Sequence, residues 1–338
     1  MTLHDIEEPE LISVIVPAFN ADETLGSTLA SIAQQSHRQL EILVIDDGSS
    51  DGTARIIAEA AAADDRIVGV SYGGNRGRSA ARNAGIASAT GEWLAFVDAD
   101  ALLHERRFEA MLEAAAAEPG CRIVTDDRWG FTVDAIGAVS MEHRFPARHT
   151  WRLGGSALLD PVRHFTDRFG HLDVLVERSY VSKLGATFPE NLAIGEDLAF
   201  YLTLLFSSPD PHPVRVAEGS YYYRLAPTGR DAGAADTWQH IIDLVVERTG
   251  SSELRELATR WQPIHSYLFE RSDRSLAAEG RLGQRKVPRD SRVTPSTGRG
   301  VPWLISVKGL QWLGRFVDRP VAGTTAADIE RQLQRTLG

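Results

Sequence analysis

Carboxylates follow two short apolar runs in the first hundred residues. Asp98 and Asp100 come directly after WLAFV at 93–97, and Asp47 comes directly after ILVID. Carboxylates two residues apart on an extended segment point to the same side, where they repel each other unless a cation or a set of donors holds them. Mg²⁺ and Mn²⁺ prefer carboxylate and phosphate oxygens. Asp98-Ala99-Asp100 is therefore a candidate site for a cation that also binds a diphosphate; the alternative is that Asp100 caps a helix.

Two further segments combine glycine with polar side chains. The segment DDGSSDGT at 46–53 begins with two consecutive carboxylates, which is more than one turn or helix cap needs. A carboxylate such as Asp47 can accept the N–H of a nucleobase. GGNRGRSAARN at 73–83 supplies glycines that admit a ligand and arginines that match phosphate oxygens. Neither segment has the spacing of a P-loop or of a dinucleotide-binding fingerprint, so we exclude P-loop NTPases and dinucleotide dehydrogenases.

The elements that must position these residues alternate along the chain. Apolar runs at 12–16, 42–46, 67–71 and 93–97 are typical of buried parallel strands. Helical patterns lie between them, the first capped by Asp22 and the second by Asp51. Ligands of such sheets bind beyond the carboxyl ends of the strands. The sequence therefore predicts that segments 17–20, 46–49, 73–75 and 98–100 meet at one edge.

The second half of the chain has weaker patterns. We expect helices at 101–120, 197–206, 236–249 and 252–279, and a strand, a turn and a strand over 214–224. Residues 121–150 alternate between strands and loops, 151–195 are rich in loops, and the polar segment 280–300 reads as a linker.

Composition limits the class of protein. The chain has 338 residues with a net charge of −10, so an acidic body argues against general nucleic-acid binding. A single cysteine, Cys121, excludes a disulfide framework. The acidic start lacks the apolar core of a signal peptide, and no apolar run is as long as a membrane span. These features predict a cytoplasmic location.

Taken together, ISVIVPAFN, VIDDGSSDGT and NRGRSAARNAGIASATGEWLAFVDAD resemble the start of a bacterial inverting family 2 glycosyltransferase over 11–105. The resemblance implies a GT-A fold, an α/β arrangement with a mostly parallel central sheet flanked by helices. It also implies a nucleotide-sugar donor, with UDP favoured, and a divalent cation, Mn²⁺ or Mg²⁺. The segment FTDRFGHLDVLVERSYVSKLG is more loosely similar to exopolysaccharide glycosyltransferases of the succinoglycan type.

Carried over position by position, the resemblance assigns roles to single residues. Asp47 would accept from uracil, Asp98 would contact ribose or metal, and Asp100 would bind the metal. The expected donor-binding set is Pro17, Ala18, Phe19, Asn20, Asp47, Asn75, Arg82, Asp98, Ala99 and Asp100. No third protein ligand for the metal is evident.

The acceptor side resembles the family's acidic motif at Gly195-Glu196-Asp197. Attack by an acceptor hydroxyl requires a general base, and we expect Asp197 to be that base while Glu196 orients loops or acceptor. A helix N-terminus favours ionised Asp197, which predicts a weak base. Tyr221 to Arg224 resembles a family pattern near the diphosphate, although the histidine that often follows is missing.

The C-terminal end is basic: residues 281–319 hold nine basic and two acidic residues. Within it, 301–317 places Trp303, Val307, Leu310 and Val317 at helical spacing. Such a segment suits either a peripheral contact with the inner face of the membrane or docking on the catalytic domain or on a second subunit. The first alternative would suit a lipid-linked sugar acceptor, and the second would allow a homo-oligomer.

The expected organisation is a GT-A domain at 1–230, followed by a helical C-terminal region at 231–338. The first part divides into a nucleotide-sugar half at 11–105 and an acceptor half at 106–230. The expected reaction moves a sugar from a nucleoside diphosphate to a hydroxyl of a carbohydrate or lipid-linked sugar, in the synthesis of a cell-surface polysaccharide or glycoconjugate. The alternatives are a non-catalytic nucleotide-sugar-binding scaffold and a sugar-phosphate nucleotidyltransferase, which would normally carry a glycine-rich basic loop where PAFNADET stands.

Overall fold

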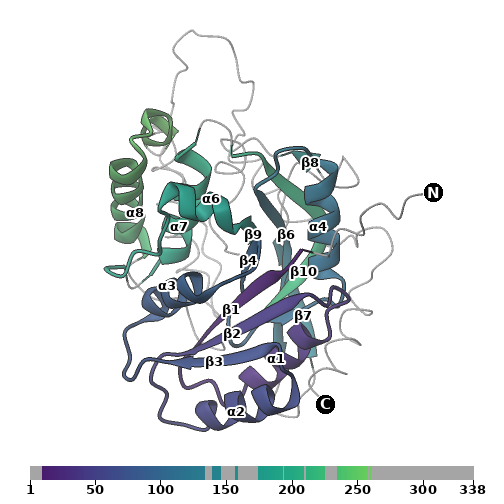
Figure 1. The fold of residues 1–338 in the computed structure, drawn as a ribbon. Coiled ribbons are helices and arrows are strands. Elements are labelled where there is room, and N and C mark those ends of the chain that lie inside the picture. The colour runs from purple at the N-terminus through teal and green to yellow at the C-terminus, as the bar shows by residue number, and fades with distance from the viewer. Residues whose placement is uncertain are drawn as a thin grey trace, which may run out of the picture.

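The computed structural model describes residues 10–133, 139–145, 157–158, 174–192, 194–208, 211–224, 234–257 and 259. Over these residues the chain forms a single 10-stranded sheet with helices on both faces (Figure 1). The main path of the sheet runs β3-β2-β1-β4-β9-β6-β10-β5, with β7 beside β6 and β8 beside β10.

The N-terminal half consists of the predicted βαβ units. Strands β1 (Ile12–Ala18), β2 (Leu40–Asp46), β3 (Ile67–Ser71) and β4 (Trp93–Phe96) alternate with helices α1 (Leu25–Ala33), α2 (Thr53–Ala63) and α3 (Arg78–Ser88). β1 pairs in parallel with both β2 and β4, and β2 pairs in parallel with β3. The carboxyl ends of these four strands therefore meet at one edge, as the sequence predicted.

The remaining elements extend the sheet with mixed direction. They are β5 (Leu102–Leu103), α4 (Arg107–Ala117), β6 (Ile123–Val133), β7 (Val139–Phe145), β8 (Ala157–Leu158), β9 (Val174–Glu177), α6 (Arg178–Leu184), α7 (Glu196–Phe206), β10 (Pro213–Arg224) and α8 (Ala234–Thr249). β9 lies antiparallel between β4 and β6, while β10 is parallel to β6. β9 could not be predicted, because the four residues VLVE are too few to show a periodicity.

Several local predictions were wrong. The helix expected from 101 begins only at Arg107, after β5, which also excludes the alternative that Asp100 caps a helix. Asp22 does not cap α1 but accepts the N–H of Gly52 at 3.2 Å, tying the β1 and β2 loops together. The expected strand, turn and strand over 214–224 is one strand, β10, with register shifts around Gly219.

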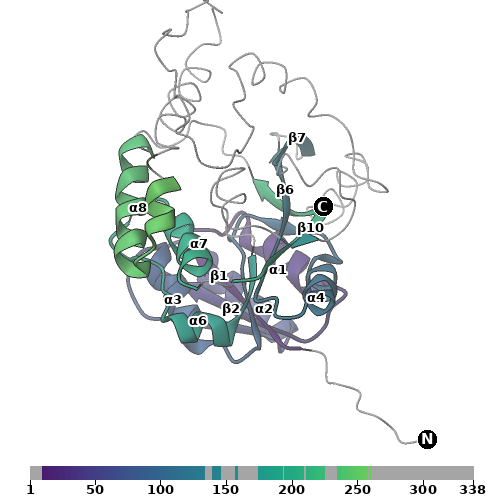
Figure 2. The ribbon, with the colours of Figure 1, turned by 90° about the horizontal axis from the view of Figure 1, so that it is seen from above.

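The core has a layer on each face of the sheet. Because side chains alternate along a strand, Ile15 of β1 packs on the layer beneath α3, α7 and α8, while Val14 and Val16 pack on the layer beneath α1 and α4. Figure 2 shows these two groups of helices on opposite sides of the sheet. A Cβ on Gly85 would lie 2.4 Å from the Ile15 side chain, so glycine lets α3 approach β1 closely.

Helix α8 joins the layer that holds α7. Its residues Ile241, Ile242, Val245 and Val246 are buried in the same apolar cluster as Phe200. No helix in the described part of the chain is both long and apolar enough to cross a bilayer. The expected basic segment 301–317 lies outside the described residues, as do the linker 280–300 and most of the helix expected at 252–279.

Candidate active site

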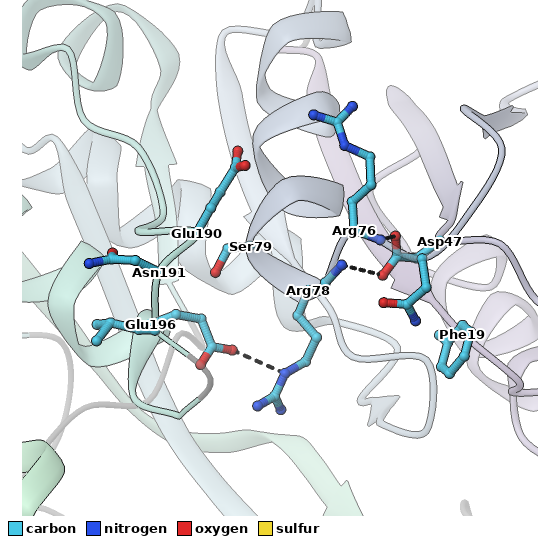
Figure 3. Close-up of a pocket in the computed structure, with 11 residues that line it drawn as sticks. Phe19, Asp47, Arg76, Arg78, Ser79, Glu190, Asn191 and Glu196 are labelled. Carbon is cyan, nitrogen blue, oxygen red and sulfur yellow. Dashed lines mark hydrogen bonds and ion pairs between the residues drawn. The ribbon is translucent and has the colours of Figure 1, made fainter.

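A cavity of about 390 Å³ opens at the carboxyl edge of the sheet (Figure 3). The expected residues Phe19, Asp47 and Asn75 line it together with Glu196 of α7. The other lining residues are Arg76, Gly77, Arg78, Ser79, Glu190, Asn191 and Leu192. The cavity thus lies between the predicted nucleotide half and the predicted acceptor half.

Several expected donor-binding residues lie beside this cavity rather than on its wall. Pro17, Ala18 and Asn20 are not among its lining residues. Ala18 is buried in the core, where its carbonyl accepts the Asp47 N–H at 2.8 Å. The Asn20 side chain accepts the Ser50 N–H at 2.9 Å. Ala18 and Asn20 thus connect the loops that follow β1 and β2.

Asp47 holds the glycine-rich loop that follows β3. Its Oδ1 accepts the Tyr72 hydroxyl at 2.9 Å and the Arg76 N–H at 2.7 Å, and its Oδ2 accepts the Gly77 N–H at 2.8 Å. Burial and this carboxylate raise the pKa of Tyr72, so its hydroxyl stays a donor. A carboxylate has about four acceptor positions, so the three donors fix Asp47 and leave room for one more on Oδ2.

Gly48 allows the same loop to approach. Its φ is +79°, and a Cβ there would lie 2.6 Å from the Gly74 carbonyl carbon. We expect Gly48→Ala to lower the affinity for the nucleotide that the sequence predicts about five- to thirtyfold, because a Cβ would force the loop away from Asp47 and a loss of about 1–2 kcal/mol in binding corresponds to that factor. Titration calorimetry with UDP measures the change. Gly26→Ala in α1 is the control, because a Cβ there meets nothing within 4 Å; equal affinities of the two variants would contradict the expectation.

One buried guanidinium connects the two halves of the site. Arg82 of α3 donates from Nη2 to Asp98 Oδ1 at 2.9 Å and from Nη1 to Glu196 Oε1 at 2.8 Å. The Arg82 side chain is 5% exposed, and it lies 5.3 Å over the Phe188 ring, which stacks on Phe200 of α7. Arg82 therefore does not line the cavity but holds the end of β4 to the start of α7.

The carboxylates after β4 fit a divalent cation. The Asp98 side chain is 42% exposed, while burial, and secondarily the charge of Asp98, raise the pKa of Asp100 to about 6 despite the opposing charges of Arg224 and Arg78. An ion held by one or two carboxylates and completed by phosphate and water oxygens would relieve this repulsion. No group of three or more potential metal-binding side chains occurs within the described ranges; among these residues Asp98 and Asp100 would therefore share a cation with other ligands, such as phosphate oxygens.

The two acids at the start of α7 have different surroundings. Glu196 is 3% exposed and pairs with both Arg82 and, at 3.3 Å, Arg78. Asp197 is partly exposed and accepts the Leu198 N–H at 2.7 Å. Burial, and then the charge of Glu196, raise the pKa of Asp197 to about 6, against the effect of Arg82. The sequence led us to expect a weak base; burial outweighs the helix N-terminus and makes Asp197 more basic.

The end of β10 reaches the same carboxylates. The Asp98 N–H donates to the Tyr221 hydroxyl at 3.2 Å, and Arg224 lies near enough to Asp100 to lower its pKa. The expected position of this segment near a diphosphate site is thus compatible with the geometry.

Sequence reasoning missed the loop that forms the far wall of the cavity. The Ser79 hydroxyl donates to the Pro189 carbonyl at 2.9 Å, and Asn83 exchanges hydrogen bonds with the backbone of Phe188 at 2.8 and 2.9 Å. These contacts span over a hundred residues, and no local pattern predicts them. Tyr72 could have been predicted, because it directly follows β3 and ligands of such sheets bind beyond the carboxyl ends of the strands.

Residues 13–166 match the family described as Glycosyl transferase family 2. Among curated proteins, the chain is 30% identical over 188 residues to the succinoglycan biosynthesis protein ExoO of Rhizobium meliloti, covering 55% of this chain and 53% of ExoO. The chain therefore spans about half the length of that relative.

Solved structures show the same fold at low identity. TarS of S. aureus in complex with UDP-GlcNAc has a TM-score of 0.58 at 17% identity, covering 70% of this chain and 66% of that chain. The mannosyltransferase PcManGT of Pyrobaculum calidifontis, in complex with GDP-Man and Mn²⁺, has a TM-score of 0.52 at 20% identity, covering 82% and 77%. The family match and the likeness to ExoO identify residues 13–166 as a family 2 glycosyltransferase region, similar to one of the succinoglycan type, and the solved structures show that the chain has the GT-A fold.

Proposed function

We propose that this chain transfers a sugar from a uridine diphosphate donor to an acceptor hydroxyl, with inversion at the anomeric carbon. The observation that carries the proposal is the Arg82 guanidinium, which bonds at once to Asp98 after β4 and to Glu196 before Asp197. This single side chain holds the carboxylate of the candidate leaving-group site at a set position relative to the start of α7, where the candidate base lies. Transfer with a single displacement needs both sites on opposite sides of one carbon.

The donor nucleotide would occupy the cavity beside the glycine-rich loop. Phe19, 48% exposed, offers a ring face for the base, and Asn75 offers an amide. The acceptor position that remains on Asp47 Oδ2 suits the N–H of uracil. The carboxylate already accepts three hydrogen bonds from the protein, so a base without a ring N–H would leave only this one position unused, and Asp47 would favour bases that carry such a donor.

Asp98 and Asp100 would hold Mn²⁺ or Mg²⁺, which when bound supplies the positive charge against which the diphosphate departs. Tyr221 and Arg82 would fix Asp98 from two sides.

Asp197 would act as the general base. The acceptor hydroxyl attacks the anomeric carbon on the face opposite the diphosphate, and its proton passes to a carboxylate oxygen of Asp197. The bond from that carbon to the diphosphate oxygen breaks with its electron pair, so the configuration inverts. With a pKa of about 6, Asp197 is ionised at neutral pH and remains basic enough to accept the proton.

The acceptor would be a carbohydrate or a lipid-linked sugar in the synthesis of a polysaccharide. ExoO is named for succinoglycan biosynthesis, and a second relative, TuaG of Bacillus subtilis, is named as a putative teichuronic acid biosynthesis glycosyltransferase. TarS bound UDP-GlcNAc, whereas PcManGT bound GDP-Man with Mn²⁺. Both kinds of donor therefore belong in the test.

Thermal unfolding with UDP, GDP, CDP and dTDP, each with and without Mn²⁺, tests the donor. At a hundredfold excess over Kd, a ligand that binds only the folded state adds about 2.7 kcal/mol of stability, or about 5–10 °C in Tm. We expect a Mn²⁺-dependent shift with UDP that Asp100→Ala removes. Asp65→Ala, which changes an exposed carboxylate at the end of α2, should keep it. No shift with any nucleotide would contradict the proposal and favour a scaffold without a donor site.

A further inference from the structure

Arg78 has an arrangement that the proposed chemistry has not yet used. It is the first residue of α3, lines the cavity and reaches across it toward α7 (Figure 3). Its Nε lies 3.3 Å from Glu196 Oε1, and its side chain is 60% exposed. Arg82, one turn further along α3, bonds to the same Glu196 oxygen at 2.8 Å and is 5% exposed.

The two arginines therefore hold Glu196 unequally. Arg82 bonds to two carboxylates at hydrogen-bond distance, and because both Arg82 and Glu196 are buried, breaking the pair between them would be costly. Arg78 makes a longer contact from a side chain that is mostly in solvent, and such contacts contribute little. Glu196 would keep a full partner in Arg82 if Arg78 moved away.

We propose that Arg78 binds the β-phosphate of the donor, exchanging Glu196 for the phosphate while Arg82 keeps Glu196 in place. This inference rests on the proposed function, since it requires a nucleoside diphosphate in the cavity. A planar guanidinium matches phosphate oxygens with two parallel hydrogen bonds. Arg78 already lines the cavity before the donor arrives, and it then neutralises the charge of the leaving diphosphate from the side of α3.

Arg76 is the nearest comparable side chain, and its surroundings differ. Its guanidinium lies 5.2 Å over the Tyr72 ring, and its backbone N–H donates to Asp47. It therefore lies at the end of the cavity assigned to the base. Both arginines line the same cavity, so Arg76 provides a matched control that separates a specific phosphate contact from general positive charge.

The test measures the affinities of uridine, UMP and UDP with Mn²⁺ by titration calorimetry. Arg78→Met replaces the guanidinium with an unbranched, uncharged side chain. A hydrogen bond to a charged group contributes about 1.5–3 kcal/mol, so we expect UDP affinity to fall about 10- to 150-fold. Uridine and UMP affinities should stay within about twofold of wild type, and Arg78→Lys should recover part of the UDP affinity.

Arg76→Met should change the three affinities by a common factor. Arg78→Met that keeps the full preference for UDP over UMP would overturn the inference and leave the proposed function standing. So would an equal loss for uridine, UMP and UDP, which would indicate a distorted pocket. A wild-type protein that binds none of the three would overturn both. The Tm of Arg78→Met should match wild type, because the side chain is largely exposed.

Discussion

Asp197→Asn is expected to lower kcat for sugar transfer by about 10²- to 10⁴-fold, the usual contribution of a general base. The amide keeps the size of the side chain but cannot take the proton of the acceptor hydroxyl. UDP affinity should stay within about twofold, because Asp197 does not line the nucleotide cavity. Release of nucleoside diphosphate, followed with the donor that the thermal screen identifies, measures the rate.

Asp65→Asn makes the same chemical change at an exposed position and should leave kcat unchanged. Asp197→Asn with kcat within tenfold of wild type would exclude Asp197 as the base. A parallel loss of UDP affinity would instead indicate that α7 had shifted. The two measurements together thus separate a lost base from a displaced helix.

The pH profile gives an independent check on the same group. The pKa of Asp197 is raised from 3.8 to about 6, chiefly by burial, and the active form is the ionised one. kcat/KM should therefore be constant at neutral pH and fall as the pH drops through about 6. A cation bound nearby would lower this pKa, so the acidic limb of the pH profile should lie at or below pH 6. A limb that persists unchanged in Asp197→Asn would belong to another group.

The residues that meet at the carboxyl edge of the sheet could be predicted because the pattern that brings them there is local. Each of the four strand ends carries its polar residues directly after an apolar run, and parallel pairing then brings Phe19, Asp47, Asn75 and Asp98 to one edge. The pattern fixed the strands to within a few residues. The two expected helix caps show its limit: Gly52, not Asp51, is the N-cap of α2, although Asp51 accepts the Thr53 N–H at 3.0 Å from the preceding turn, and Asp22 bonds to the neighbouring loop.

The role of Arg82 could not be predicted from its position in the sequence. The resemblance placed it in the nucleotide pocket, yet its partners Asp98 and Glu196 are 16 and 114 residues away. Only the close packing of α3 on β1, which Gly85 permits, brings the guanidinium between them. Likewise, the basicity of Asp197 depends on how deeply α7 is buried, which the helical pattern alone does not give.

A second buried network, behind the site, carries the largest expected effect on stability. Asp126 of β6 accepts two hydrogen bonds from Arg107 of α4, at 2.9 and 3.1 Å, and a third from the Ser220 hydroxyl of β10. Both side chains of the Arg107–Asp126 pair are 0% exposed. Burial lowers the pKa of Arg215 to about 10, and Asp126 opposes this shift. The negative charge of Asp126 thus stabilises two buried guanidinium groups, those of Arg107 and Arg215.

Asp126→Asn should therefore lower the free energy of unfolding by about 3–5 kcal/mol, because it leaves buried positive charge without its counter-charge. At about 2–4 °C per kcal/mol, Tm should fall by about 6–20 °C. Glu59→Gln is the control, since its pair with Arg55 is more than half exposed on both sides and such pairs contribute under about 1 kcal/mol. Denaturant titration of both variants gives the comparison. Equal stabilities would mean that Asp126 does not hold α4 to β10.

The same change should reach the active site through Tyr221. This residue follows Ser220, its ring lies 5.2 Å from the Arg107 guanidinium, and its hydroxyl accepts the Asp98 N–H at 3.2 Å. If Asp126 anchors β10, its loss should weaken Mn²⁺-dependent UDP binding even at temperatures where Asp126→Asn is fully folded. Unchanged binding in that range would show that Arg82 alone is enough to hold Asp98, so that the two networks act independently.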